Sequence, residues 1–308
     1  MFKTIILRLI TGGLVLFFVV SLTFFLIRYL PGGPFDTEKD LPPKIMENLE
    51  KKYQFNEPLW KQYIIYIDNL VHGDFGPSYK YVDRSANEII ADTFPVSLQL
   101  GITALLISLV FGISLGVLSS LSPRSFTDFL TAFISISLVS VPNFVVGAIL
   151  IYFFSVRLGW FPAALWGRPE HYILPSFTLA AGSTAYIARL VRSSMIEASR
   201  ELYVRTAMAK GLSRIKIIYK HILRNALIPV VTVLGPIFAY LITGSFVVEH
   251  IFAIPGMGRF FVFAVSNRDY SVVLAITIVY TIILVLANLI VDILYTRLDP
   301  RISYNKNA

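Results

Sequence analysis

The sequence predicts an all-α integral membrane protein with six transmembrane helices. Its composition is the first indication: 56% of the 308 residues are hydrophobic and 15% are charged, with a mean hydropathy of +0.69, whereas soluble domains carry about 25% charged residues. The second indication is that the charges lie in clumps between long apolar runs. A soluble multi-domain enzyme would have to bury several such runs of helical length, so that class is disfavoured.

Six apolar runs are long enough to cross a membrane, because a helix needs about 20 residues to span about 30 Å of hydrocarbon. They cover 9–30, 95–121, 126–156, 173–191, 227–248 and 272–295. The first run follows Lys3 and Arg8, as the apolar core of a signal peptide follows its basic start. Its core is too long for a signal peptide, however, and Pro31 follows in place of a small-residue cleavage site, which indicates an uncleaved anchor.

Basic residues gather before the first run, between the second and third, between the fourth and fifth, and after the sixth. Because Lys and Arg collect in short cytoplasmic loops, both termini are predicted to be cytoplasmic in a multi-pass membrane protein. These cytoplasmic basic residues account for the net charge of +8, so no nucleic-acid partner is predicted. The sequence has no cysteine, which excludes disulfides and cysteine-based catalysis or metal binding, and no metal site is predicted.

The chain divides into four predicted regions. They are an N-terminal segment with the first helix (1–30), an extracytoplasmic loop (31–94), a core of five helices (95–298) that includes a cytoplasmic loop (192–226), and a cytoplasmic tail (299–308). The extracytoplasmic loop is too long for a bare connection. We therefore expect it to fold as a small helical element.

Three amphipathic helices are predicted in this extracytoplasmic loop. The first is opened by Pro42 and Pro43, and its apolar residues are Ile45, Met46, Leu49 and Tyr53. The second has Asn56 as its cap and Pro58 in its first turn, and its apolar face consists of Leu59, Trp60, Tyr63, Ile64, Ile67 and Val71. The capping box Ser85-Ala86-Asn87-Glu88 begins the third. A passive spacer would not need three such helices, so a docking surface is favoured.

The cytoplasmic loop 192–226 is the most informative segment. It predicts a short helix with one face, small in its middle, formed by Val204, Ala207, Met208, Gly211 and Leu212. Small residues let another backbone approach closely, whereas Arg205 and Lys210 lie off this face. Gly211 is expected to end the helix in the left-handed conformation.

A second helix is predicted after Ser213, which is its expected cap. Its basic stripe consists of Lys216, Lys220 and Arg224, and another side consists of Ile215, Ile218 and Ile222. Such a segment suits the lipid headgroup layer, before the chain turns inward at Pro229. A solvated basic loop would explain the lone charges but not a small-residue face ended by glycine.

These segments together resemble a known family. The cytoplasmic loop resembles the loop that couples peptide-type permeases of ABC importers to their ATPases. The matching residues are Arg205-Thr206-Ala207-Met208-Ala209-Lys210-Gly211-Leu212, followed by Asn225-Ala226-Leu227-Ile228-Pro229. Arg205-Thr206-Ala207 stand where the general signature has Glu-Ala-Ala. Further matches lie at 30–35, 248–258, 267–270 and 298–301, and 72–78 resembles the oligopeptide permease B subunit in particular.

The resemblance implies a type I ABC importer permease fold that transports oligopeptides by alternating access; dipeptides, glutathione and nickel remain alternative substrates. The implied location is a bacterial inner (cytoplasmic) membrane. The implied partners are a second homologous permease, two ABC ATPase subunits and an extracytoplasmic peptide-binding protein. The implied ATPase-coupling residues are Val204, Arg205, Thr206, Ala207, Met208, Lys210, Gly211 and Leu212. The chain lacks a P-loop, so it is predicted to be no enzyme and to bind no cofactor, ATP and Mg being bound by the ATPases.

The polar residues inside the predicted spans include Asn143, Asn288 and Asp292. Polar groups in a span face the protein interior or a wet cavity. They therefore either line a translocation path or form hydrogen bonds between helices, where small residues such as Gly112 and Gly116 allow close packing. Both interpretations stay open at this point.

Two other function classes compete with the importer. An intramembrane protease needs a serine nucleophile within reach of a histidine base. The candidates are Ser183 and Ser245 with His171 and His250, and their spacing matches no dyad. An ion-coupled secondary transporter usually shows intramembrane charge and an internal repeat; no clear repeat is visible, and only Arg189 and Asp292 lie near the ends of spans.

Overall fold

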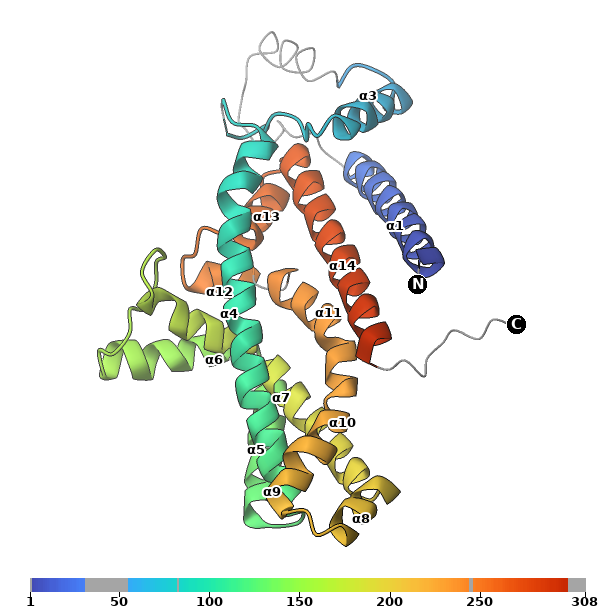
Figure 1. The fold of residues 1–308 in the computed structure, drawn as a ribbon. Helices are drawn as coiled ribbons and strands as arrows, with labels where there is room; N and C mark the ends of the chain where they lie inside the picture. Colours follow the sequence, from blue (N-terminus) through green and yellow to red (C-terminus); the bar gives the residue numbers. More distant parts are fainter. Residues whose placement is uncertain (1, 31–54, 82, 244–245, 299–308) are drawn as a thin grey trace. The chain divides into compact units, whose positions relative to one another are not determined.

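The computed structural model describes residues 2–30, 55–81, 83–243 and 246–298, which form helices joined by turns (Figure 1). Within these residues the β-type pairing is limited to an isolated antiparallel bridge between Pro77 and Ser85, so the all-α class is confirmed. The predicted helix that begins at Pro42 lies outside the described residues.

The chain forms two compact units, each made of two segments. They are Met1–Val96 with Pro255–Ile283, and Ser97–Ile254 with Leu284–Ala308. The first holds α1 (Phe2–Tyr29), α3 (Leu59–Val71), the beginning of α4 (Ala86–Leu121), α13 (Met257–Ser266) and the beginning of α14 (Tyr270–Leu298). The second holds the rest of α4 and α14 and, between them, α5 (Phe126–Ser140), α6 (Asn143–Leu150), the π-helix η1 (Ile151–Arg157), α7 (Glu170–Ser199), α8 (Leu202–Ala209), α9 (Arg214–Lys216), the π-helix η2 (Ile217–Leu223), α10 (Arg224–Ala226), α11 (Ile228–Thr243) and α12 (Phe246–Ile251). The division into four regions stays a prediction.

In the first unit, α3 packs on the C-terminal part of α1 through aromatic rings (Figure 1). Phe24 stacks on Tyr66 with 5.5 Å between the ring centroids, and the hydroxyls of Ser21 and Tyr63 lie 2.6 Å apart. Trp60, by contrast, is 63% exposed. The predicted apolar face of α3 is therefore divided, with Tyr63 against α1 and Trp60 on the surface.

The capping box that was predicted before the second span is confirmed. The Ser85 N–H donates to Glu88 Oε2 at 3.0 Å, and the Glu88 N–H donates to Ser85 Oγ at 3.2 Å. The helix that it opens continues through Pro95 as the 36-residue α4, so the predicted third loop helix and the second span are one helix. Asn56 is not a cap: Pro58, in extended conformation, holds the N-cap position of α3.

The prediction of one continuous helix over 126–156 is wrong. The helix breaks between α5 and α6, and the two parts are bent by 109°. Proline disfavours helical geometry in the residue before it, and Val141, which precedes Pro142, is extended with φ of −88° and ψ of 124°. Pro142 then becomes the N-cap residue of α6.

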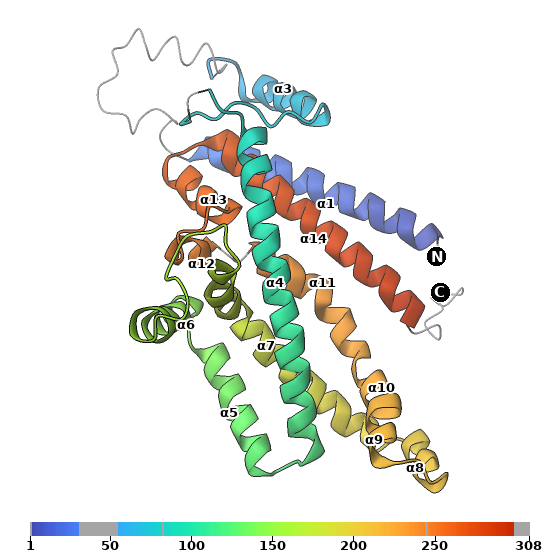
Figure 2. The same ribbon diagram turned by 60° about the vertical axis from the view of Figure 1, so that its left-hand side comes forward.

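In the second unit, α5, α6 and α11 pack against α7, which lies beside α4 (Figure 2). Gly112 and Gly116, one helical turn apart on α4, allow this contact. A Cβ at Gly112 would lie 3.0 Å from the carbonyl oxygen of Thr184, and one at Gly116 would lie 2.7 Å from that of Ala188. The predicted use of small residues for close helix packing is confirmed here.

Four helices in the described part are long and apolar enough to cross a membrane, and a fifth is counted if α5 to η1 form one bent span. The 30-residue α7, which contains the predicted fourth span, is not among them. It is rich in alanine and hydroxyl side chains, and half of its residues are buried. The number of six spans stays a prediction.

Candidate functional site

The helix α8 ends in a Schellman motif, as the sequence predicted for Gly211. Gly211 follows the C-cap residue Lys210 and has φ of +72°. Its N–H donates to the Met208 oxygen at 2.9 Å, and the Leu212 N–H donates to the Ala207 oxygen at 3.3 Å. A Cβ at position 211 would meet open space, so glycine is favoured there by the backbone conformation and not by packing.

One side of α8 belongs to the apolar core. Val204 and Ala207 are 0% and 4% exposed, and they form a cluster with Val191 and Met195 of α7 and Ile217 of η2. Burial of a valine side chain contributes about 1.5–3 kcal/mol. Because protein interiors are close-packed and transmit strain, α8 and the end of α7 form one packed region.

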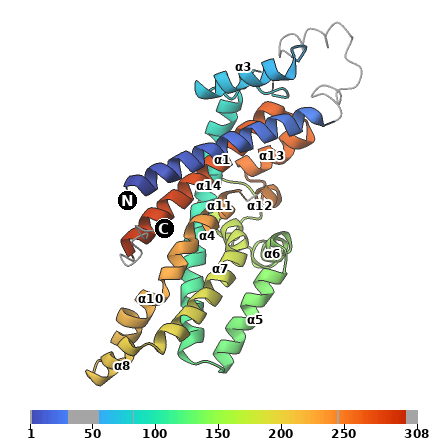
Figure 3. The same ribbon diagram turned by 90° about the vertical axis from the view of Figure 1, so that its right-hand side faces the viewer.

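The opposite side of α8 is exposed. We call this surface the α8 ridge; it consists of Arg205, Thr206, Met208, Lys210 and Gly211. The sequence had grouped Val204 and Ala207 on one helix face with Met208 and Gly211, but the structure buries the first two and exposes the last two. The ATPase-coupling role of these residues stays a prediction. An eight-residue helix is not stable alone, so α8 depends on the packing of Val204 and Ala207, while the ridge stays exposed. Figure 3 shows α8 beside the C-terminal end of α7.

The segment after α8 differs from its predicted register. Ser213 occupies the expected N-cap position, but its side chain makes no capping hydrogen bond. Ile217 and Ile222 are buried, whereas Ile215, which was predicted on the apolar side, is 70% exposed. The π-helix η2 explains the difference, because its longer hydrogen-bond repeat rotates successive residues away from α-helical positions.

An apolar groove of about 540 Å³ lies beside the α8 ridge. Its walls come from the turn after α4, the end of α7, α8 and η2, and include Pro123, Met195, Met208 and Ile218. Met208 belongs to both the ridge and the groove. The accessible surface around α8 therefore combines basic and small polar residues with an apolar depression.

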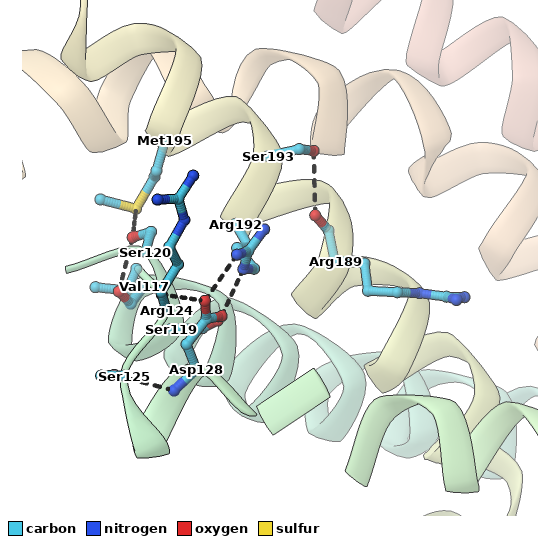
Figure 4. Close-up of polar contacts among 10 residues, drawn as sticks. All are labelled: Val117, Ser119, Ser120, Arg124, Ser125, Asp128, Arg189, Arg192, Ser193 and Met195. Atoms are coloured by element: carbon cyan, nitrogen blue, oxygen red, sulfur yellow. Dashed lines mark hydrogen bonds and ion pairs between the residues drawn. The ribbon is translucent and has the colours of Figure 1, made fainter. Parts of the chain in front are cut away.

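A buried carboxylate holds the α4–α5 turn against α7 (Figure 4). Asp128, 6% exposed, accepts bonds from Arg192 Nε at 2.6 Å and Arg192 Nη2 at 2.8 Å. It also accepts from the Ser119 hydroxyl at 2.5 Å and the Arg124 N–H at 2.8 Å. We call these four residues the Asp128 cluster. The sequence analysis missed it, although Ser125, three residues before Asp128, has the spacing of a helix cap.

A cavity of about 820 Å³ lies in the second unit, in the size range of ligand sites. Its walls are mainly apolar, and its polar lining residues are Asn143, Ser183, Tyr186, Arg189 and Tyr240. The break before α6 places Asn143 there. Asn288 and Asp292 do not line this cavity: on α14, Asn288 is exposed and Asp292 is half-buried.

A second buried carboxylate joins the two chain segments of the first unit. Asp269, at the N-cap position of α14, accepts a hydrogen bond from the Ser78 hydroxyl and another, at 3.2 Å, from the Tyr79 N–H. We call these three residues the Asp269 cluster. It joins two of the motifs that the sequence analysis had singled out, 72–78 and 267–270. Burial raises the pKa of Tyr79 and of the neighbouring Tyr66, so both hydroxyls stay protonated at neutral pH.

A third buried acidic group lies in the second unit, and the sequence analysis did not identify its role. Glu249 of α12 is fully buried and accepts the Ser97 hydroxyl of α4 at 2.7 Å. Its segment, 248–258, was recognised as a motif, but its partner could not be inferred because the two residues are distant in the sequence. The contact attaches α12 to α4.

Comparison with known sequences decides the family. The family described as binding-protein-dependent transport system inner membrane component matches residues 89–304. The chain belongs to this family. The resemblance found in its motifs is thereby confirmed, and the chain is a membrane component of such a transport system.

Several members of the family are similar over their whole length. The oligopeptide transport system permease protein OppB of Haemophilus influenzae is 47% identical over 99% of this chain and 100% of its own length. The dipeptide transport system permease protein DppB of Bacillus subtilis is 46% identical over 94% of each chain. OppB of Escherichia coli is 42% identical over 99% and 100%.

Two solved structures share the fold. A crystal structure of an amino acid ABC transporter with histidines matches with a TM-score of 0.54 at 18% identity, over 68% of this chain and 94% of the other. An inward-facing MetNI methionine ABC transporter matches with a TM-score of 0.54 at 17% identity, over 68% and 96%. The predicted type I importer fold of this family is confirmed.

Proposed function

We propose that this chain is a transmembrane permease subunit of an ATP-driven importer that moves oligopeptides into the cytoplasm by alternating access. The relatives named for oligopeptide transport support the substrate. The observation that carries the mechanism is the two-sided α8, with one side packed into the core beside α7 and the other exposed as the α8 ridge.

The α8 ridge is the contact surface for the ATPases. ATP and Mg bind to two partner ATPase subunits, whose closure pushes the ridge. Because Val204 and Ala207 pack against α7, the motion passes to α7. Four α7 residues line the cavity: Gly182, Ser183, Tyr186 and Arg189. The helix α7 thus connects the packed side of α8 with the cavity wall. A second homologous permease forms the rest of the translocation path.

The orientation follows from the coupling surface. The α8 segment faces the cytoplasm, where the basic residues of 192–226 meet lipid headgroups, and both termini are cytoplasmic. The helical element containing α3 then faces outward and receives an extracytoplasmic peptide-binding protein through Trp60 and Ile64, both exposed. Replacing both with serine should slow peptide delivery while basal ATP hydrolysis continues; unchanged delivery would assign α3 another role.

Site-specific crosslinking tests the α8 assignment. The chain has no native cysteine, so single cysteines can be placed at Met208, on the ridge, and at Ala207, one residue away but buried. In native membranes the cysteine at 208 should capture an ATPase subunit, and the one at 207 should not. If neither position captures an ATP-binding protein, the mechanism is wrong.

A matched pair of variants at Gly211 tests coupling. Gly211→Ala adds only the strain of a left-handed alanine, about 1–2 kcal/mol, whereas Gly211→Glu also places a bulky charge on the ridge. The alanine variant should keep most ATP-dependent uptake, and the glutamate variant should hydrolyse ATP with uptake reduced at least about tenfold. Equal uptake by the two variants would remove position 211 from the contact.

Dipeptide import is the second candidate, because two similar relatives are named dipeptide permeases, at 46% and 40% identity. Uptake of di-alanine and penta-alanine by the reconstituted complex separates the two substrates. An ion-coupled transporter is tested in the same vesicles: uptake that persists without the ATPases under an ion gradient would exclude the ABC mechanism.

A further inference from the structure

We propose that Arg189 binds the α-carboxylate of the peptide inside the cavity. The inference rests on the proposed function, since it names the part of a peptide that the cavity wall would recognise. It starts from a contrast between two arginines on α7, three residues apart in the sequence.

Arg189 and Arg192 have different surroundings (Figure 4). Arg192 uses two guanidinium nitrogens to bind both carboxylate oxygens of Asp128. The Arg189 side chain extends away from the Asp128 cluster and lines the cavity. No carboxylate in the described part of the chain forms an ion pair with it.

The Arg189 guanidinium at the cavity wall can bind an anion. Arg189 lies near the end of its predicted span, and its side chain is exposed, so it is accessible to an anion that enters the cavity. Most of the surrounding wall is apolar, with residues such as Val139, Phe144 and Ile237. Arg189 is the one charged residue of the described chain that lines the cavity, so its charge acts on whatever enters.

The peptide carboxylate is the anion that fits. Peptides of varied sequence share only a backbone and two termini, and of these only the carboxylate is negative. A planar guanidinium binds a carboxylate through two parallel N–H bonds. Tyr186 and Tyr240 line the same cavity, and their rings accommodate apolar side chains while their hydroxyls bond to backbone groups.

The test is uptake of tetra-alanine and of its C-terminal amide by proteoliposomes that contain the complete importer and its binding protein. The measured quantity is the acid-to-amide uptake ratio of each variant divided by that of the wild type, so any preference of the binding protein cancels. Arg189→Gln should lower this ratio about tenfold. Arg189→Lys, which keeps the charge but not the planar fork, should lower it less.

Arg168→Gln is the control, because Arg168 is 77% exposed at its side chain and does not line the cavity; its ratio should stay at one. Equal loss of both peptides in Arg189→Gln would overturn the proposal and assign Arg189 to assembly with the partner permease. An unchanged ratio would also overturn it. Absence of ATP-dependent uptake of either peptide by the wild type would instead reject the proposed function itself.

Discussion

Asp128 and Asp269 lie one in each unit, and both are buried carboxylates near the N-terminus of a helix, where a negative charge is favourable. Asp128 accepts bonds from the cationic Arg192, from a serine hydroxyl and from a backbone N–H. Asp269 accepts from the neutral Ser78 hydroxyl and the Tyr79 N–H. Each joins segments that are far apart in the sequence.

The difference lies in what remains when the carboxylate is removed. At the Asp128 cluster a guanidinium would be left without its counter-charge, whereas at the Asp269 cluster only dipoles would be left. Arg192 of the Asp128 cluster lies on α7 three residues before Met195, which packs in the same core cluster as α8. The region beside the proposed coupling helix should therefore be the more sensitive of the two.

The largest expected effect is that of Asp128→Ala. Breaking an ion pair by removing its buried partner destabilises a protein by about 3 kcal/mol. This is the low end of the range for fully buried pairs, because the Arg192 side chain is 36% exposed and can still be hydrated. Thermal unfolding of this subunit in the purified complex measures the loss. Asp92→Ala is the control, since Asp92 pairs with Arg84 but is 69% exposed, and exposed pairs contribute at most about 1 kcal/mol.

Asparagine substitutions at both sites sharpen the comparison. Asp128→Asn keeps the shape but leaves Arg192 facing a neutral amide, and we expect a loss of about 2–3 kcal/mol. Asp269→Asn still offers an oxygen to Ser78 and Tyr79, and the loss should stay near 1 kcal/mol. Equal losses at the two sites in the same unfolding measurement would show that the charge on Arg192 is not what distinguishes them.

Asp269→Ala should have an intermediate effect of about 2 kcal/mol, since it removes the cap of α14 and leaves buried donors unsatisfied. Limited proteolysis after 72–78 offers a local readout, because this segment loses its attachment to α14. A loss as large as that of Asp128→Ala would contradict the ranking.

The smallest effects are expected from the hydroxyl donors. Ser119→Ala and Ser78→Ala each remove one hydrogen bond to a carboxylate that keeps its other partners. Ser78→Ala also removes the acceptor of the Lys80 and Tyr81 N–H groups, and each variant should cost about 1–2 kcal/mol. Similar melting temperatures for the two variants would show that the clusters differ through Arg192 alone. A much larger loss for Ser78→Ala would reverse the comparison.

Some features of this protein follow from local sequence alone. The helical class, the Ser85–Glu88 capping box and the helix end at Gly211 were all predicted, and the structure confirms them. Each depends on residues within one or two helical turns, so neighbouring residues carry the whole signal. The family motifs are likewise short runs of sequence, and the comparisons confirm them.

Other features depend on residues that are distant in the sequence. Only the tertiary structure decided which side of α8 is buried, because Val204 finds its partners on α7 and η2. The tertiary structure also decided that Asp128 pairs with Arg192, 64 positions away, and that Arg189 lines the cavity. Helical periodicity specifies that a face exists, but the elements packed around a helix determine which face remains free.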